Sequence, residues 1–167
     1  MELNFKLVFL TALIPLIIGF IWFNPAVFGN TWMRASGTSR PDNVSKGKMF
    51  LTFGLVYVFG LMLSMMLMGI VIHQMSVYSV LMNEPGLNDP QSELGKYVSD
   101  FMAKYGHNFR TFKHGVLHGT MTALFLSIPV IGTISLFERR RFAYFAVHIG
   151  YWILTLALMG GVICQFL

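Results

Sequence analysis

Four long stretches without a charged residue constrain this chain more than any other feature of its sequence. They cover residues 7–33, 49–83, 114–137 and 142–167, and each is at least 24 residues long. A helix needs about 20 apolar residues to cross the hydrocarbon core of a bilayer. Only 11% of the residues are charged, about half the share in soluble domains. The sequence therefore predicts an integral membrane protein with four spans.

The pattern within these stretches predicts helices rather than strands. Strands of outer-membrane barrels alternate polar and apolar residues over about ten positions, and these stretches do not alternate. We expect an all-α integral membrane protein in which residues 1–167 form a single four-helix membrane domain. The expected transmembrane helices cover residues 6–28, 48–74, 115–137 and 142–165.

The long loop between the second and third spans carries the pattern of an amphipathic helix. Asp89 and Pro90 suit the N-cap and first turn of a helix over residues 90–106. Its apolar face includes three aromatic residues, Tyr97, Phe101 and Tyr105. We expect this helix to lie on the bilayer surface or over the ends of the spans; the alternative is a solvated helix packed on its own loop.

Aromatic and small residues elsewhere predict surfaces that face lipid or a partner. Trp22 and Trp32 lie around the end of the first span, and tryptophan rings favour the membrane interface. Gly115 and Gly119 form a G-x-x-x-G pattern, the spacing that lets two helices approach closely. These four residues and the three loop aromatics form the expected lipid or partner interface. The alternative for the glycines is packing inside the bundle.

Two segments of the chain repeat at a constant offset of 91 residues. Residues 63–74 match residues 154–165 at seven of twelve positions. An Ile-Pro pair also occurs in both the first and the third span, at Pro15 and Pro129. We therefore expect a duplicated helical hairpin whose two copies begin on the same side of the membrane, which is a parallel repeat.

The distribution of positive charge predicts the orientation in the membrane. Seven Lys and Arg residues fall in the loops after the first and third spans, and five fall on the other side. Cytoplasmic loops carry the excess of Lys and Arg. We expect loops one and three in the cytoplasm, and both termini on the periplasmic side of a bacterial inner membrane. Topology then explains the net charge of +5, and we expect no nucleic-acid partner.

Histidine is the most specific polar feature of the sequence. His114 and His118 lie one helical turn apart, and His73 falls at the same expected side of the membrane. Neutral imidazole is a ligand for zinc, copper, iron and haem. The sequence thus offers His73 and His118 as haem ligands, or all three side chains as ligands of a divalent metal. The alternative is that these side chains bond headgroups, water or backbone carbonyls, with no cofactor.

Several classes of function lack the residues that they need. Apart from Lys6 and Lys48 at the first residues of two expected spans, the spans contain no Asp, Glu, Lys or Arg, the residues that mark proton relays and coupled ion paths. A single cysteine, Cys164, excludes an internal disulfide and a zinc site with several thiolates. The sequence holds no hydrolase signature, phosphate-binding glycine loop or paired carboxylate, so we expect no catalytic residue.

The segment GFIWFNPAVFGNTWM, Gly19 to Met33, resembles the opening of a family of small bacterial membrane proteins described only as a domain of unknown function. In that family a glycine, a W-[YF]-x-P, an F-G and a W-M recur at this spacing. The later segments HGVLHG, FER and GYW, which begin at residues 114, 137 and 150, also look like its members. The resemblance implies a four-helix inner-membrane protein and carries no activity, cofactor or catalytic residue.

Three functions are compatible with these features. The leading hypothesis is a non-catalytic membrane subunit or accessory protein that docks onto a larger membrane complex, because the spans lack charge and carry many small residues. The second is a haem- or metal-binding redox or ligand module that uses the histidines. The third is a small channel or carrier, which the parallel repeat and the glycine-rich helix faces favour.

Overall fold

The computed structural model describes residues 4–39 and 43–167. Every regular element in those residues is helical, and four of the segments are long and apolar enough to span a membrane. They are Phe5–Trp22, Lys46–Val71, Phe112–Phe137 and Phe142–Phe166. The predicted fold class and the four spans are confirmed. Within the expected range of 6–28, the first span ends at Trp22, before the Asn24-Pro25 pair, where a helix end is expected. The chain turns there, and the Asn24 carbonyl accepts bonds from two later amides.

The first and third spans are each interrupted before a proline. The first consists of α1 (Phe5–Thr11) and α2 (Ile14–Trp22). The third consists of α7 (Phe112–Thr122), a π-helical turn η1 (Ala123–Ser127) and α8 (Ile128–Phe137). Pro15 and Pro129 both lie in the first turn of the second piece, where a missing N–H costs no intrahelical bond. The two Ile-Pro pairs of the repeat therefore occupy equivalent places.

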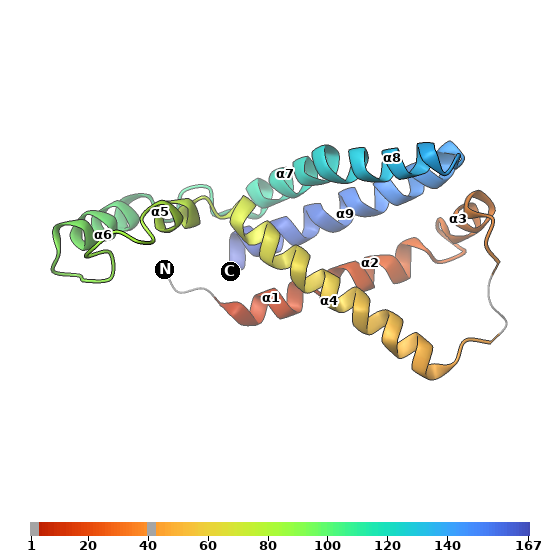
Figure 1. Ribbon diagram of the computed structural model, residues 1–167, viewed down its shortest axis with the longest axis horizontal. Helices are drawn as coiled ribbons and strands as arrows, with labels where there is room; N and C mark the ends of the chain where they lie inside the picture. Colours follow the sequence, from red (N-terminus) through yellow and green to blue (C-terminus); the bar gives the residue numbers. More distant parts are fainter. Residues whose placement is uncertain (1–3, 40–42) are drawn as a thin grey trace.

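Helix α9 (Phe142–Phe166) is the centre of the bundle. In the most apolar 18-residue stretch of α9, 61% of the residues are buried inside the molecule. The corresponding share for the third span is 11%. Figure 1 shows α7 and α8 running alongside α9, while α4 (Lys46–Val71) crosses the bundle obliquely. The core at this crossing consists of apolar side chains. Leu67 of α4 and Ile72, which follows α4, pack with Leu156, Met159 and Ile163 of α9.

In the described part of the chain, three shorter helices lie outside the spans. The loop after the first span contains α3 (Gly29–Ser36), which the sequence pattern does not predict. A further helix, α5 (Gln74–Val80), follows α4 directly. The amphipathic helix is α6 (Glu93–Tyr105), and its predicted N-cap was wrong: the Ser92 hydroxyl, not Asp89, accepts the bond from the Gly95 amide at 2.8 Å.

Helix α6 packs on its own loop. A side chain at Gly95 would overlap the Asp89 carbonyl, so the helix lies directly against the turn that precedes it. Val98 is the other buried residue of α6. In Figure 1, α5 and α6 extend beyond the ends of the spans. This arrangement matches the alternative of a helix packed on its own loop.

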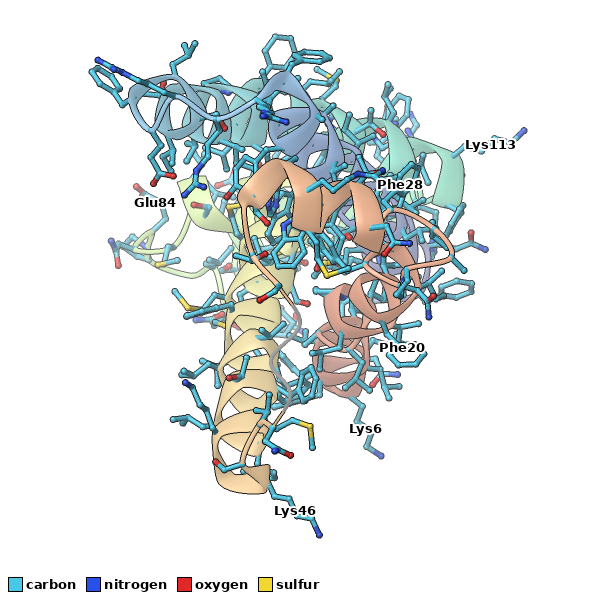
Figure 2. All side chains as sticks on the ribbon, turned by 90° about the vertical axis from the view of Figure 1, so that its right-hand side faces the viewer. Lys6, Phe20, Phe28, Lys46, Glu84 and Lys113 are labelled. Atoms are coloured by element: carbon cyan, nitrogen blue, oxygen red, sulfur yellow. The ribbon has the colours of Figure 1, made fainter. Side chains whose placement is uncertain are left out.

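The two ends of the bundle have the relative arrangement that the sequence predicts. The Asn4 amide donates to the Leu167 carbonyl at 3.4 Å, so the start of α1 and the end of α9 lie at the end that carries α5 and α6. Figure 2 shows Lys6, Lys46 and Lys113 projecting from the bundle. Arg40, one of the seven cations of loops one and three, lies outside the described residues.

An arginine joins the two loops at the opposite end. The Arg140 guanidinium donates to the Ser36 carbonyl at 3.0 Å and to Glu138 at 2.8 Å. The hydrogen bond to Glu138 raises the pKa of Arg140, so this cation stays charged. The contact holds the end of α3 against the short turn between α8 and α9.

The close contact of α7 with α9 predicts the effect of a larger residue at position 119. In Gly119→Val, the new Cβ would overlap the Leu156 carbonyl. We expect the free energy of unfolding to fall by about 1–3 kcal/mol, the usual cost of overpacking. Titration with sodium dodecyl sulfate, followed by circular dichroism in mixed micelles, measures this change.

Gly54→Val is the matched control, because nothing lies within 4 Å of a Cβ at that position of α4. Equal stability of the two variants would contradict the packing described here.

Candidate metal centre

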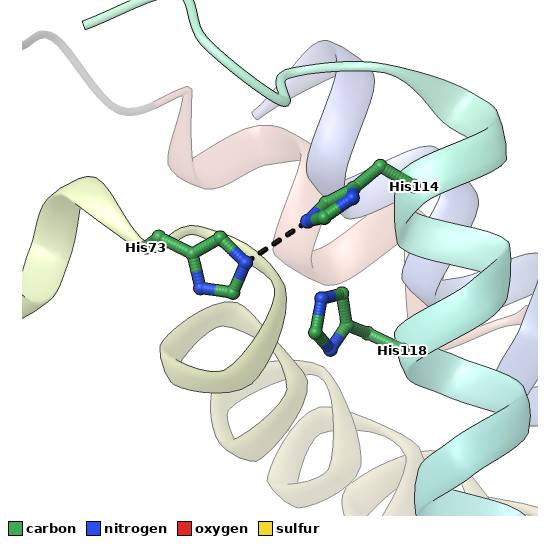
Figure 3. A group of neighbouring side chains, drawn as sticks. All are labelled: His73, His114 and His118. Carbon is green, nitrogen blue, oxygen red and sulfur yellow. Dashed lines mark hydrogen bonds between the residues drawn. The ribbon is translucent and has the colours of Figure 1, made fainter. Parts of the chain in front are cut away.

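Glycines on α7 and α9 determine where the histidines of α7 lie. A Cβ at Gly115 would overlap the Gly160 carbonyl, and a Cβ at Gly160 would overlap the Gly115 carbonyl. The backbones of the two helices are thus in direct contact, which only glycine permits. The glycine face of α7 points to α9, and the neighbouring face, with His114 and His118, points to the end of α4 (Figure 3).

A capping bond fixes the start of α7 and with it His114. The Thr111 hydroxyl accepts a bond from the His114 amide at 3.2 Å. Threonine is a favoured N-cap because its oxygen satisfies an amide that has no partner in the first turn. His114 is therefore the third residue of α7, and His118 follows one turn later.

His73 comes from the junction between α4 and α5. Helix α4 ends at Val71, and the fully buried Ile72 turns the backbone out of helical geometry with ψ near 86°. Gln74 begins α5, and its side-chain amide donates to the Asn108 carbonyl at 2.8 Å. The junction is thereby held between the core and the loop before α7, with the exposed His73 ring facing α7.

The three imidazole rings form one cluster, shown in Figure 3. The Nε2 atoms of His73 and His114 are 2.9 Å apart and share a hydrogen bond. The ring centres of His73 and His118 are 4.8 Å apart, and those of His114 and His118 are 4.5 Å apart. One ring nitrogen from each residue lies within 4.8 Å of the others. The predicted set of His73, His114 and His118 is thus brought together.

Residues 108–112, which lead into α7 beside this cluster, are held by the side chains of Gln74, Cys164 and Gln165. Besides the Gln74 bond, the Phe112 amide donates to the Gln165 side chain at 3.0 Å, and the Cys164 thiol lies 3.3 Å from the Phe109 carbonyl. Gln74 and Gln165 are equivalent in the 91-residue repeat. Phe109 has a left-handed backbone, with φ of 62°, and its ring lies 5.1 Å from that of His114.

The other predicted interface residues mostly make contacts within the chain. Trp22 donates to the Val147 carbonyl at 3.0 Å, and Trp32 donates to His148 Nε2 at 3.2 Å. Gly115 and Gly119 pack on α9, which is the alternative use considered for them. On α6, Tyr97 is 66% exposed and Tyr105 is 40% exposed. Phe101 is partly buried against the ring of Tyr105.

The comparison with family models gives one result for nearly the whole chain. The family described as "Protein of unknown function (DUF1761)" matches residues 7–164. The chain belongs to the DUF1761 family. The match confirms the resemblance to a family of unknown function. No curated protein and no solved structure matched the chain.

The sequence alone did not locate the anchoring residues of this DUF1761 member. The identical glutamines of the repeat were the available signal, because an amide side chain in an apolar segment needs a hydrogen-bonding partner. The end of α4 at Val71 had no comparable signal, since neither glycine nor proline follows it within the next ten residues.

Loss of one glutamine anchor should open the segment between α6 and α7. Gln74→Leu keeps most of the side-chain volume but removes the donor to the Asn108 carbonyl. A neutral hydrogen bond contributes about 1 kcal/mol, so we expect tryptic cleavage after Arg110 to accelerate between about fivefold and tenfold.

Limited proteolysis in detergent measures this rate. Gln91→Leu is the control, because its exposed side chain makes no hydrogen bond to the described residues. Equal cleavage of the two variants would argue against the anchor.

Proposed function

We propose that this protein binds one divalent transition-metal ion through His73, His114 and His118. The convergence of three ring nitrogens within 4.8 Å supports this proposal. Imidazole suits zinc, copper and nickel, and three histidines with an open fourth position form one common class of zinc site. Zinc is therefore the first ion to test.

The cluster needs only a small rearrangement to bind such an ion. Zinc–nitrogen bonds of about 2.0–2.1 Å in a tetrahedron place the nitrogens about 3.3 Å from one another. The hydrogen-bonded pair at 2.9 Å would move apart slightly, and His118 would move closer. The bond between His73 and His114 requires a proton on one Nε2. Metal binding shifts that proton to the Nδ1 atom of the same ring, which leaves both Nε2 atoms free to bind.

A bare ion fits the cluster better than a haem does. A haem with two histidine ligands has its porphyrin plane between the two rings. The rings of His73 and His118, the pair predicted for haem, have their centres only 4.8 Å apart, and His73 is also hydrogen-bonded to His114. A porphyrin would have to separate α7 from the α4–α5 junction, whereas an ion would join them.

The position of the cluster indicates what the ion would do. His73 is exposed at the end of the bundle, so an ion can enter from the aqueous side. Once bound, it would join the second and third spans, which belong to different copies of the repeat. Metal binding would then stabilise the folded chain through mass action, and the open fourth position would accept water or an external ligand.

Zinc titration tests the proposal directly. We expect purified protein to bind one Zn²⁺ ion per chain in isothermal titration calorimetry. The variants His73→Ala, His114→Ala and His118→Ala should each weaken binding by about a hundredfold or more, because even the loss of a residue that only supports a ligand costs 10–100-fold.

His107→Ala is the matched control, since His107 is exposed near the same end of the bundle but outside the cluster. It should bind zinc like the wild type. Failure of the wild type to bind Zn²⁺, or an equal loss in His107→Ala, would overturn the proposal.

We also propose the orientation given by the positive charges, with loops one and three in the bacterial cytoplasm. Cysteine labelling of intact cells tests it with a membrane-impermeant maleimide. Tyr97→Cys, on exposed α6, should label in intact cells, and Val44→Cys, in the first loop, only after lysis. The wild type is the control, because its Cys164 is fully buried. The reverse pattern would invert the orientation.

Docking to a larger complex and transport through a small channel stay predictions. The exposed Tyr97 and Tyr105 of α6 are compatible with docking but do not identify a partner. The metal site is the better supported function because specific donor atoms converge there.

A further inference from the structure

A second site lies at the other end of α9, between α2, α4 and α9. A cavity of about 780 Å³ opens there, and its walls include Phe23, Trp32, Tyr151 and Trp152. This volume lies within the range of 300–1,000 Å³ that is typical of small-molecule sites. About 24 Å of helix separates His148, which lines the cavity, from Cys164 beside the histidine cluster. The two sites are therefore independent.

The cavity opens toward lipid. Phe20 and Phe53 line it from α2 and α4, and they are 80% and 54% exposed. Figure 2 shows Phe20 on the outer side of its helix. Since both residues belong to spans, their exposed rings face the hydrocarbon region. A ligand with a long apolar tail can therefore enter from the bilayer and leave its tail there.

His148 and Asn24 each offer a hydrogen-bond donor in this largely aromatic cavity. The Trp32 indole donates to His148 Nε2 at 3.2 Å; because an indole N–H only donates, a neutral His148 carries its proton on Nδ1. No hydrogen bond joins Nδ1 to another described residue. The Asn24 side-chain oxygen accepts from the Ala26 amide at 2.9 Å, which leaves its NH₂ group as the second donor.

The absence of charge narrows the class of ligand. None of the described residues that line the cavity is Asp, Glu, Lys or Arg, so the cavity offers no countercharge to a phosphate or carboxylate. Its donors instead suit neutral carbonyl oxygens. The rings of Phe23 and Tyr151 are 5.3 Å apart and those of Tyr151 and Trp152 are 5.0 Å apart, which provides faces for a flat ring.

We propose that this cavity binds a lipid-soluble quinone. A quinone is a flat, neutral ring with two carbonyl acceptors and an apolar tail, and each of these parts has a counterpart in the site. One carbonyl accepts a hydrogen bond from His148 Nδ1, the Asn24 amide offers the second, and the tail passes between α2 and α4 into the bilayer.

Decylubiquinone is the probe for this site. The protein is placed in phosphatidylcholine nanodiscs and titrated while tryptophan fluorescence is followed, because a bound quinone quenches Trp32 and Trp152 at short range. We expect saturable quenching with one quinone per chain. Decanol at the same concentrations has the tail without the ring and should not compete.

Three variants test the parts of the site separately. His148→Phe removes the imidazole donor. Asn24→Asp removes the amide donor but keeps the oxygen that accepts from the Ala26 amide. Each variant should weaken quinone binding about tenfold, the effect of one lost hydrogen bond. Gly19→Leu should abolish binding, because a Cβ there has no neighbour nearer than 3.7 Å and the longer side chain would fill the cavity.

Gly54→Leu is the control for Gly19→Leu, since it adds the same side chain to an open face of α4 outside the cavity. Circular dichroism and the gel-filtration volume establish that each variant is folded. The proposal would be overturned by non-saturable quenching, by competition from decanol, or by wild-type affinity in folded Gly19→Leu.

Discussion

Direct backbone contact between α7 and α9 is the constraint on which the rest of this molecule depends. Lipid tails are as apolar as leucine, so burial of apolar side chains alone does not hold helices together in a bilayer. Gly115, Gly119 and Gly160 remove the side chains that would separate the two backbones. The third span, with few buried residues of its own, is thereby fixed to the central helix, and its histidines are brought beside the end of α4.

Both candidate sites lie where helices are interrupted or end, rather than along their regular middle turns. The histidine cluster forms at the α4–α5 junction and the first two turns of α7, while the cavity forms around the end of α2 and the start of α9. Polar groups cost least near the ends of spans, where water can reach them. The interior of the bundle is left to apolar residues and small residues.

Charge-free stretches and residue spacing were sufficient to predict the four spans, the amphipathic helix and the three histidines, because each leaves a local pattern. Helix α3 and the N-cap at Ser92 were not predicted, since tertiary contacts and turn geometry decide them. The cavity was also missed: it depends on the paths of α2 and α4, two helices separated by the first loop. His148 had no neighbour in the sequence that would indicate its bond to Trp32.

The central place of α9 affects how the chain can be made. It follows the other three spans in the sequence, so they are synthesised and inserted before the helix on which they pack exists. Each must therefore be stable alone in lipid for that interval. This is possible because charged residues in the spans are confined to the first few positions, which leaves a long charge-free stretch in each. Assembly of the core then waits until α9 enters among helices that already cross the membrane.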